Sequence, residues 1–300
     1  MAQNEIFSTS KAPVTLPEAV TEQVFDFAQK ESIITKLATP TTLSLGKNTS
    51  FEFTGGIEVG KVDEMGKKPV SSPGFESVSL TPFKVATIVP VTTEALMTDR
   101  VGVYEKIKRE MGLAVARYLD TLVFHGKDRS TGNEIVGQKS IIGGNSAKIE
   151  VSGNDYKAAT LAAIGAASAK RGGRPNGVAI DSSAHFGLLS AINETQFGLP
   201  NLGGDVVNVA GLPGHVSNTV SWINGDTYTN DKMIVGDWRQ VIYGFASDIQ
   251  WAVSDEASIT IGDQVLSAFE HNLKLIRVET FLGATVVDAS AFAVVQDATA

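Results

Sequence analysis

The stretch VYEKIKREMGLAVARYLDTLVF, residues 103–124, decides the fold of this chain. Its apolar residues recur with the spacing of one helical face, so the stretch predicts a long amphipathic helix. The apolar face holds Tyr104, Ile107, Met111, Ala114, Tyr118 and Leu122, widened by Val115 and Leu119. The opposite side carries Glu105, Lys106, Lys108, Arg109 and Glu110. At about 1.5 Å per residue the helix would be roughly 33 Å long, about the width of a small domain.

The surroundings of this helix indicate that it organises the rest of the chain. His125-Gly126 ends it, because glycine readily adopts the positive φ found just past a helix end. An ordinary core helix would show the same periodicity. Here, however, long strand-like runs precede the helix, a Gly-rich polar segment follows at 125–144, and no other helical pattern in the chain is as long. We therefore interpret it as a spine.

Composition and charge restrict the class of protein. With 300 residues, 43% of them apolar, the chain can bury a sizeable core in one large domain or two modest ones. The absence of cysteine excludes disulfides, thiolate nucleophiles and Cys-ligated metals. No run of 18 apolar residues and no signal-peptide pattern is present, so no membrane segment is expected. The net charge of −8 argues against a protein whose main task is neutralising nucleic-acid phosphates.

The N-terminal region predicts a short helix that cannot bury its own apolar face. Thr15 and Glu18 form a capping box, and Pro17 lies in the first turn. Pro40 prevents the following apolar segment from continuing as a helix. The helix carries one apolar stripe, made of Leu16, Val20, Val24 and Phe27. Because the unit is small, we expect this stripe to dock on the body or on another subunit.

Two predicted strands, at 49–53 and 77–90, flank the unusual segment GGIEVGKVDEMGKKPVSSPGFE at 55–76. The segment is rich in glycine and charge and cannot form a core. If the chain from Phe51 to Pro82 folds back as a hairpin, each arm of about 15 residues would reach roughly 45–50 Å. A disordered surface loop is the alternative, but the alternation of apolar and charged residues favours a ribbon that becomes ordered across a neighbouring molecule.

The remaining elements predict a second compact region followed by a strand-rich C-terminal third. The predictions are a helix at 155–170 capped by Asn154 or Asp155, a strand at 176–181, a helix at 182–192, strands around a turn at 211–214, and strands at 233–238, 240–255 and 272–296. Strands this long pair with partners distant in sequence. We expect one layered unit in which a sheet packs on the spine helix.

Motifs of enzymes and metal sites are absent from the sequence. His125, His185, His215 and His271 lie far apart and have no partner at metal-ligand spacing. Neither the phosphate-loop motif GxxxxGK[ST] nor the nucleophile motif GxSxG occurs. The charged cluster at 63–68 resembles an acid/base group, but a Gly-rich extended loop would not desolvate it or shift its pKa. No catalytic residue, cofactor or metal is expected.

Eight stretches, taken in order, resemble the major capsid proteins of tailed bacteriophages with the HK97 fold. No single stretch is diagnostic, and the resemblance lies in their order and spacing from Leu16 to Val295. The stretches are LPEAVTEQVFDFAQKESIITKLA, the loop at 55–76, VSLTPFKVATIVPVTTEALMTD, YLDTLVFHGKD, GVAIDSSAHFGLLSAI, AGLPGHVSNTV, IVGDWRQVIYGF and NLKLIRVETFLGATVVDASAFAVV.

The resemblance implies an α+β fold with four parts. These are an N-terminal arm at 1–45, an extended β-hairpin loop at 46–83, a peripheral domain at 84–150 and 245–287 with the spine helix 103–124, and an axial α/β domain at 151–244 and 288–300. The implied contacts between subunits are the loop residues Ile57, Glu58, Val59, Lys61, Val62, Asp63, Glu64, Met65, Lys67 and Lys68 and the arm stripe Leu16, Val20, Val24 and Phe27.

The implied function is structural and not enzymatic. Such subunits form pentamers and hexamers of an icosahedral phage head that encloses double-stranded DNA, assembled in the host cytoplasm. Portal and decoration proteins are further implied partners, and contact with DNA would be weak and non-specific. Only about 15 residues precede the predicted arm helix, so the scaffold is a separate protein, has been cleaved away or is unnecessary. An encapsulin-type compartment that holds protein cargo is the alternative.

Overall fold

The computed structural model describes residues 31–46, 48–53, 59–62, 64, 67–71, 75–98, 102–152, 155–169, 173–185, 206–225, 227–247 and 249–298. The predicted arm helix and its stripe of Leu16, Val20, Val24 and Phe27 lie outside these residues. The described helices are α2 (Ile33–Leu37), α3 (Thr93–Met97), α4 (Val103–His125) and α5 (Tyr156–Ser168), and the 3-10 helices are η1 (Asn218–Val220), η2 (Trp238–Gln240) and η3 (Ala289–Ala291).

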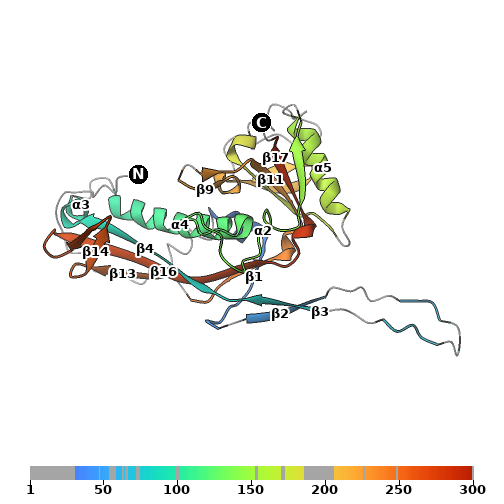
Figure 1. The fold of residues 1–300 in the computed structure, drawn as a ribbon, viewed down its shortest axis with the longest axis horizontal. Coiled ribbons are helices and arrows are strands. Elements are labelled where there is room, and N and C mark those ends of the chain that lie inside the picture. The colour runs from blue at the N-terminus through green and yellow to red at the C-terminus, as the bar shows by residue number, and fades with distance from the viewer. Residues whose placement is uncertain are drawn as a thin grey trace.

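The strands within the described residues form two main sheets and three separate two-stranded hairpins. They are β1 (Thr39–Pro40), β2 (Asn48–Phe53), β3 (Phe75–Leu80), β4 (Phe83–Thr92), β5 (Ala147–Val151), β6 (Gly177–Ile180), β7 (Val206–Val209), β8 (Leu212–Val216), β9 (Trp222–Asn224), β10 (Thr227–Tyr228), β11 (Asp231–Gly236), β12 (Val241–Phe245), β13 (Gln250–Ser254), β14 (Ser258–Ile261), β15 (Gln264–Ser267), β16 (Leu273–Val286) and β17 (Phe292–Asp297). The molecule is elongated, with α4 lying along one face of the sheet that contains β4, β16 and β13 (Figure 1).

Helix α4 has the predicted limits to within one residue. It ends where Gly126 adopts φ +69° and donates its N–H to the carbonyl of Leu122. The buried face differs from the predicted one: Ala114 is exposed, and Lys108, predicted for the polar side, is 4% exposed. The lysine ammonium pairs with Glu105 and lies 5.0 Å from the centre of the Tyr104 ring. Its long apolar stem can therefore be buried while the charge keeps partners.

The five-stranded sheet beneath α4 is centred on β16. Along one side β16 pairs with β4, and along the other it pairs first with β13 and then with β12, to which β1 adds in parallel. The side chains of Val115, Leu119 and Leu122 from α4 join Ile276 and Val278 of β16 in the main core. The strand predicted at 77–90 is in fact two strands, because the chain leaves regular pairing at 81–82, where Pro82 has no N–H to donate.

The six-stranded sheet has the order β5-β17-β11-β6-β8-β7. Helix α5 packs on it through Ala159, Ala163 and Ala167, small residues that let a helix approach a sheet closely. Asp155 caps this helix by accepting the N–H of Ala158 at 2.9 Å, which confirms one of the two predicted caps. The turn predicted at 211–214 lies instead at 210–211, and the rest of that stretch belongs to β8.

The last predicted strand, at 272–296, is divided between the two sheets. It breaks after β16, where Asp288 caps η3, and resumes as β17 in the six-stranded sheet. The predicted segment limits at 150/151 and 244/245 fall inside β5 and β12, respectively. The predicted helix at 182–192 is described only at 182–185, where it is helical. The division into an axial and a peripheral domain stays a prediction.

Candidate intersubunit surfaces

The β2–β3 hairpin is anchored to the body at its root. Its strands pair from Asn48 opposite Leu80 to Phe53 opposite Phe75. Val78 and Leu80 are 5% and 8% exposed, and Leu80 lies against Gly283 of β16, where a side chain on the glycine would meet it. The Asn48 amide donates to the carbonyls of Ser44 and Gly46 at 2.9 Å. The direction of the hairpin is therefore set by packing at this root.

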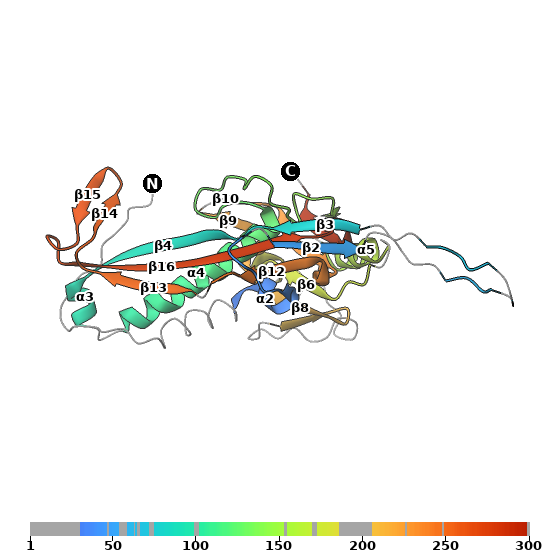
Figure 2. The ribbon, with the colours of Figure 1, turned by 90° about the horizontal axis from the view of Figure 1, so that it is seen from below.

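Beyond the root, the described parts of the loop run past the end of the body (Figure 2). Val59 is 93% exposed, Val70 is 90% exposed, and Val62 is also exposed. The charged side chains of this region that the structure describes are exposed as well; they are Lys61, Glu64, Lys67 and Lys68. Of the predicted contact residues, Ile57, Glu58, Asp63 and Met65 lie outside the described residues. Apolar side chains left in solvent on a ribbon gain stability only if another molecule covers them.

The second surface is a furrow between α4 and β4. Among the described strands β4 pairs only with β16, so its other edge is open. Two hollows of about 340 and 470 Å³ lie between this strand and the helix, and both are lined by Thr87 and Ala114. The larger one is apolar, with Val89, Ile107 and Met111 on its walls. Open strand edges and apolar furrows are surfaces that bind extended segments of other chains.

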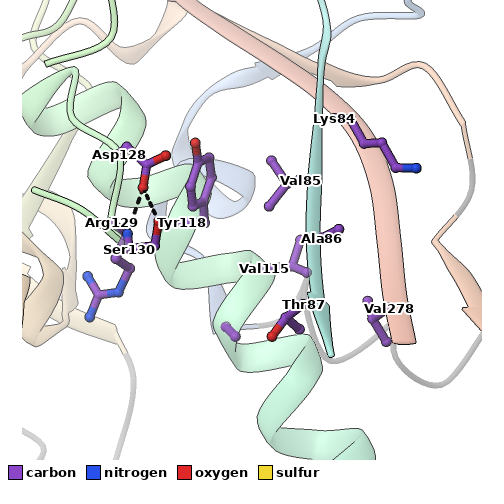
Figure 3. A pocket seen from close by; sticks show the side chains of 11 residues that line it. Lys84, Val85, Ala86, Thr87, Val115, Tyr118, Asp128, Arg129, Ser130 and Val278 are labelled. Atoms are coloured by element: carbon purple, nitrogen blue, oxygen red, sulfur yellow. Dashed lines mark hydrogen bonds between the residues drawn. The ribbon is translucent and has the colours of Figure 1, made fainter. Parts of the chain in front are cut away.

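The charged side chains around the smaller hollow are engaged within the chain (Figure 3). Asp128 accepts from the N–H and hydroxyl of Ser130 at 2.7 and 2.6 Å. Arg129 points away from the hollow and lies 3.9 Å from the centre of the Trp222 ring. Lys84 also points away and pairs with Glu279 at 2.8 Å. This arrangement fixes the loop after α4 and leaves the floor of the hollow to aliphatic side chains.

The two acidic groups at this hollow have pKa values shifted away from neutrality. Burial acts to raise the pKa of Asp128, but hydrogen bonds from Ser130 and Thr131 outweigh it and hold the pKa below its ordinary value. Burial, with a contribution from the Asp128 charge, raises the pKa of Tyr118 to about 12. At neutral pH the carboxyl is ionised and the phenol is protonated. Neither group is therefore suited to transferring protons near pH 7.

The third surface, which sequence reasoning missed, is the hairpin β14–β15 at the end of the molecule opposite the long loop (Figure 2). Its underside packs through Ile259 on a small core of Ala268, Leu273 and Leu275. Val265 and Phe269 are 70% and 81% exposed. The signal was present in the sequence: Gly262-Asp263 is a two-residue turn between alternating residues, and Gly262 has φ +62°.

Metal-binding clusters of three or more His, Cys, Asp or Glu do not occur within the described residues. In the same part of the chain, no helix combines the length and the apolar character needed to cross a membrane. His125 contacts the carbonyl of Thr219 at 3.4 Å, and the ring of His271 contacts the carbonyl of Ser267 at 3.0 Å. Both rings therefore contact backbone carbonyls.

A long helix on a β16-centred sheet, a second α/β sheet and a projecting hairpin define the class of HK97-like capsid folds. The sequence matches the model of the Phage capsid family over residues 12–297, and the chain belongs to this family. It is 22% identical over 303 residues to the "Probable major capsid protein gp17" of Mycobacterium phage D29, covering 90% of this chain and 87% of the relative. The family is a structural one and not a class of enzymes.

Solved structures agree with this fold. A chain from Gordonia phage Cozz matches with a TM-score of 0.73 and 24% identity, covering 90% of this chain and 87% of that one. A chain from Mycobacterium phage Ogopogo matches with a TM-score of 0.72 and 25% identity, covering 89% and 92%. These likenesses confirm the predicted α+β, HK97-like fold. They do not favour the encapsulin alternative.

Proposed function

We propose that this chain is the major capsid protein of a tailed phage, the repeating subunit of the shell. Besides membership of the family, the observation that carries this proposal is the ribbon at 59–71. Its described apolar side chains are exposed and uncovered by their own chain. A subunit whose elements lack cover gains it when the same contact repeats from copy to copy, and such a contact either closes into rings or forms filaments. In this proposal the rings are pentamers and hexamers.

The acceptor for the ribbon in this proposal is the α4–β4 furrow of the neighbouring copy. The ribbon and the furrow are complementary in shape and in apolar character. The ribbon projects with exposed valines, and the furrow is hollow and lined by Val89, Ile107 and Met111. Lys106 and Glu110 at the rim of the furrow provide both signs of charge for the charged ribbon. Covering the open edge of β4 would also remove a site of unwanted strand pairing.

The other partners follow from the shell. The shell would enclose double-stranded DNA, and the net charge of −8 per subunit is consistent with weak, non-specific contact. A separate scaffolding protein would guide closure, a portal would occupy one vertex, and decoration proteins would bind the finished surface. Assembly would take place in the host cytoplasm, and the final location would be the capsid of the virion.

Assembly combined with thiol cross-linking tests the shell function and the α4–β4 furrow as the acceptor of the ribbon. Cross-linking can be site-specific because the native chain has no cysteine. Val62→Cys and Ala114→Cys are made as separate single variants, mixed, assembled and treated with a short thiol-to-thiol cross-linker. We expect a covalent dimer that contains one copy of each variant. The control replaces Ala114→Cys by Leu161→Cys, an exposed position on α5 that should give no dimer. If shells form but Val62→Cys and Ala114→Cys do not cross-link, the furrow is not the acceptor of the ribbon. Failure of the unmodified chain to assemble, with or without a scaffold, would overturn the shell function.

A further inference from the structure

Asp120 is a buried carboxylate near the middle of the molecule, on the C-terminal half of α4, and is 1% exposed. One carboxylate oxygen, Oδ1, accepts from the Ser32 hydroxyl at 2.6 Å and from the N–H of Ile34 at 3.2 Å. The other, Oδ2, accepts from the N–H of Ile33 at 3.3 Å and from the Thr219 hydroxyl at 3.1 Å. All four donors are neutral groups, and they come from two segments distant from α4 in sequence.

The first segment is the beginning of α2, which needs acceptors that the helix itself cannot supply. The first N–H groups of a helix have no partner within the helix. Here they are also cut off from water, because Ser32, Ile33 and Ile34 are all 0–1% exposed. Ser32 caps Thr35, and its own hydroxyl proton goes to Asp120. The N–H groups of the next two residues depend on a carboxylate 86–87 positions away.

The second segment is η1, which belongs to the region of the six-stranded sheet. Thr219 is fully buried, and its hydroxyl bonds to Asp120 while its carbonyl contacts His125 one turn further along α4. Asp120 therefore lies where the start of α2, the spine helix and the second sheet region meet. Burial raises the pKa of Asp120, although the four hydrogen bonds act to lower it.

We propose that Asp120 is the positioning residue that holds the root of the N-terminal segment, so that it decides where that segment leaves the body. The part of the chain before residue 31 lies outside the described residues, and the proposal concerns only its root at 32–34. Within the described residues, Asp120 is the acceptor for both the Ile33 and the Ile34 N–H groups. Loss of the carboxylate should free the root and leave both sheets intact.

The substitution Asp120→Asn is a sharp test because of how the donors are divided. The two backbone N–H groups point at different carboxylate oxygens. An asparagine has one oxygen and one NH₂ group, so either orientation of its amide leaves one of these N–H groups facing another donor. The hydroxyls of Ser32 and Thr219 can rotate to adapt, but a backbone N–H cannot. A buried donor without a partner destabilises the element that carries it.

Trypsin cleavage after Lys36 reports on the root directly. Lys36 lies within α2, so this bond becomes accessible only when the helix opens. With the full-length chain kept dilute and unassembled, we expect Asp120→Asn to be cut there roughly tenfold faster or more, as suits a buried donor that has lost its partner. Circular dichroism should remain that of the native chain. Because the subunits are unassembled, the result is independent of whether the chain forms shells.

The matched control is Asp181→Asn, which alters a carboxylate that is also buried and also accepts from serine hydroxyls, but from Ser183 and Ser221 and not from the start of α2. Its cleavage after Lys36 should match that of the native chain. Equal acceleration in both variants would indicate general loosening and would overturn the proposal, as would an unchanged rate in Asp120→Asn. If Asp120→Asn does not fold, Ser32→Ala decides: a severalfold faster cut supports the proposal, and an unchanged one contradicts it.

Discussion

Two hairpins at opposite ends of the molecule have opposite relations to the body. The hairpin β14–β15 turns over two residues, 262–263, and packs Ile259 on the small core formed by Ala268 with Leu273 and Leu275 of β16. The hairpin β2–β3 is regular for six residue pairs and is joined by the long segment 54–74, whose described part lies in solvent. Turn chemistry and local packing are enough to place the short hairpin. The long one is packed against its own chain only at its root, so we expect its outer part to become ordered through contacts with a second copy.

Removing the long segment should have the largest effect on assembly and little on folding. Deletion of 57–73 joins Gly56 to Gly74 and keeps the last strand pair, Phe53 with Phe75. Shortening a loop costs little entropy, so we expect a thermal melting curve close to that of the native chain. Electron microscopy should show no shells. A chain of native length with Val59, Val62 and Val70 changed to Ser separates apolar contact from length, and it should also assemble poorly. Normal shells from both variants would contradict the claim that the long segment makes contacts between copies.

A smaller effect should distinguish the packed side chain of the short hairpin, Ile259, from the exposed Phe269 in the turn that follows it. Ile259→Ala removes part of a packed side chain and should lower the stability of the tip by about 1 kcal/mol. Phe269→Ala removes a side chain that is 81% exposed, so it should change stability by less than about 0.5 kcal/mol. Hydrogen exchange at 258–267 measures the first effect, and particle yield measures any role of Phe269 between subunits. Equal loss of protection in both variants would show that Phe269 packs on the hairpin and would contradict this prediction.

The smallest expected effect is electrostatic. Lys274 of β16 lies 3.2 Å from the carboxylate of Asp255 near the tip and holds its pKa below the ordinary value of 3.8. For a carboxyl with a lowered folded pKa, the stabilisation is present above 3.8 and is lost as the pH falls through the folded value. Acidification from pH 7 to 5 should therefore leave this contact intact. An NMR titration of Asp255 should show a midpoint below 3.8, and Lys274→Met should move it upward. An unchanged midpoint would mean that the pair does not form in solution.

What could be predicted from the sequence depended on local signals. The limits of α4 follow from periodicity and Gly126, and the start of α5 from Asp155, because each signal lies within a few residues of its effect. The buried face of α4 could not be predicted in detail. Lys108 is buried because its partners lie on the same helix, and Asp120 because its donors come from α2 and η1. Periodicity treats both as surface residues.

Pairing between distant strands was also beyond local reasoning. The run 272–296 alternates or runs apolar except for a short polar break at 288–290, and that pattern does not show that the chain changes sheets after Val286. The hairpin at 258–267, by contrast, could have been predicted from a local signal, the two-residue turn Gly262-Asp263 between alternating residues. The intersubunit contacts of the long-loop residues remain a prediction, because those contacts require a second copy. A single chain shows their exposure but not their partners.

The place of β16 and β17 has a consequence for the order in which the protein can be made. β16 is the middle strand of one sheet and β17 lies between β5 and β11 in the other, yet both are among the last segments to be synthesised. Until β16 and β17 emerge from the ribosome, β4 and β5 lack their pairing partners, which lie well over a hundred residues downstream. Neither sheet can close on a partial chain, and such non-local pairing is slow. Ribosome-bound fragments therefore lack the body to which neighbouring copies bind, and only chains synthesised past residue 297 can be built into a larger particle.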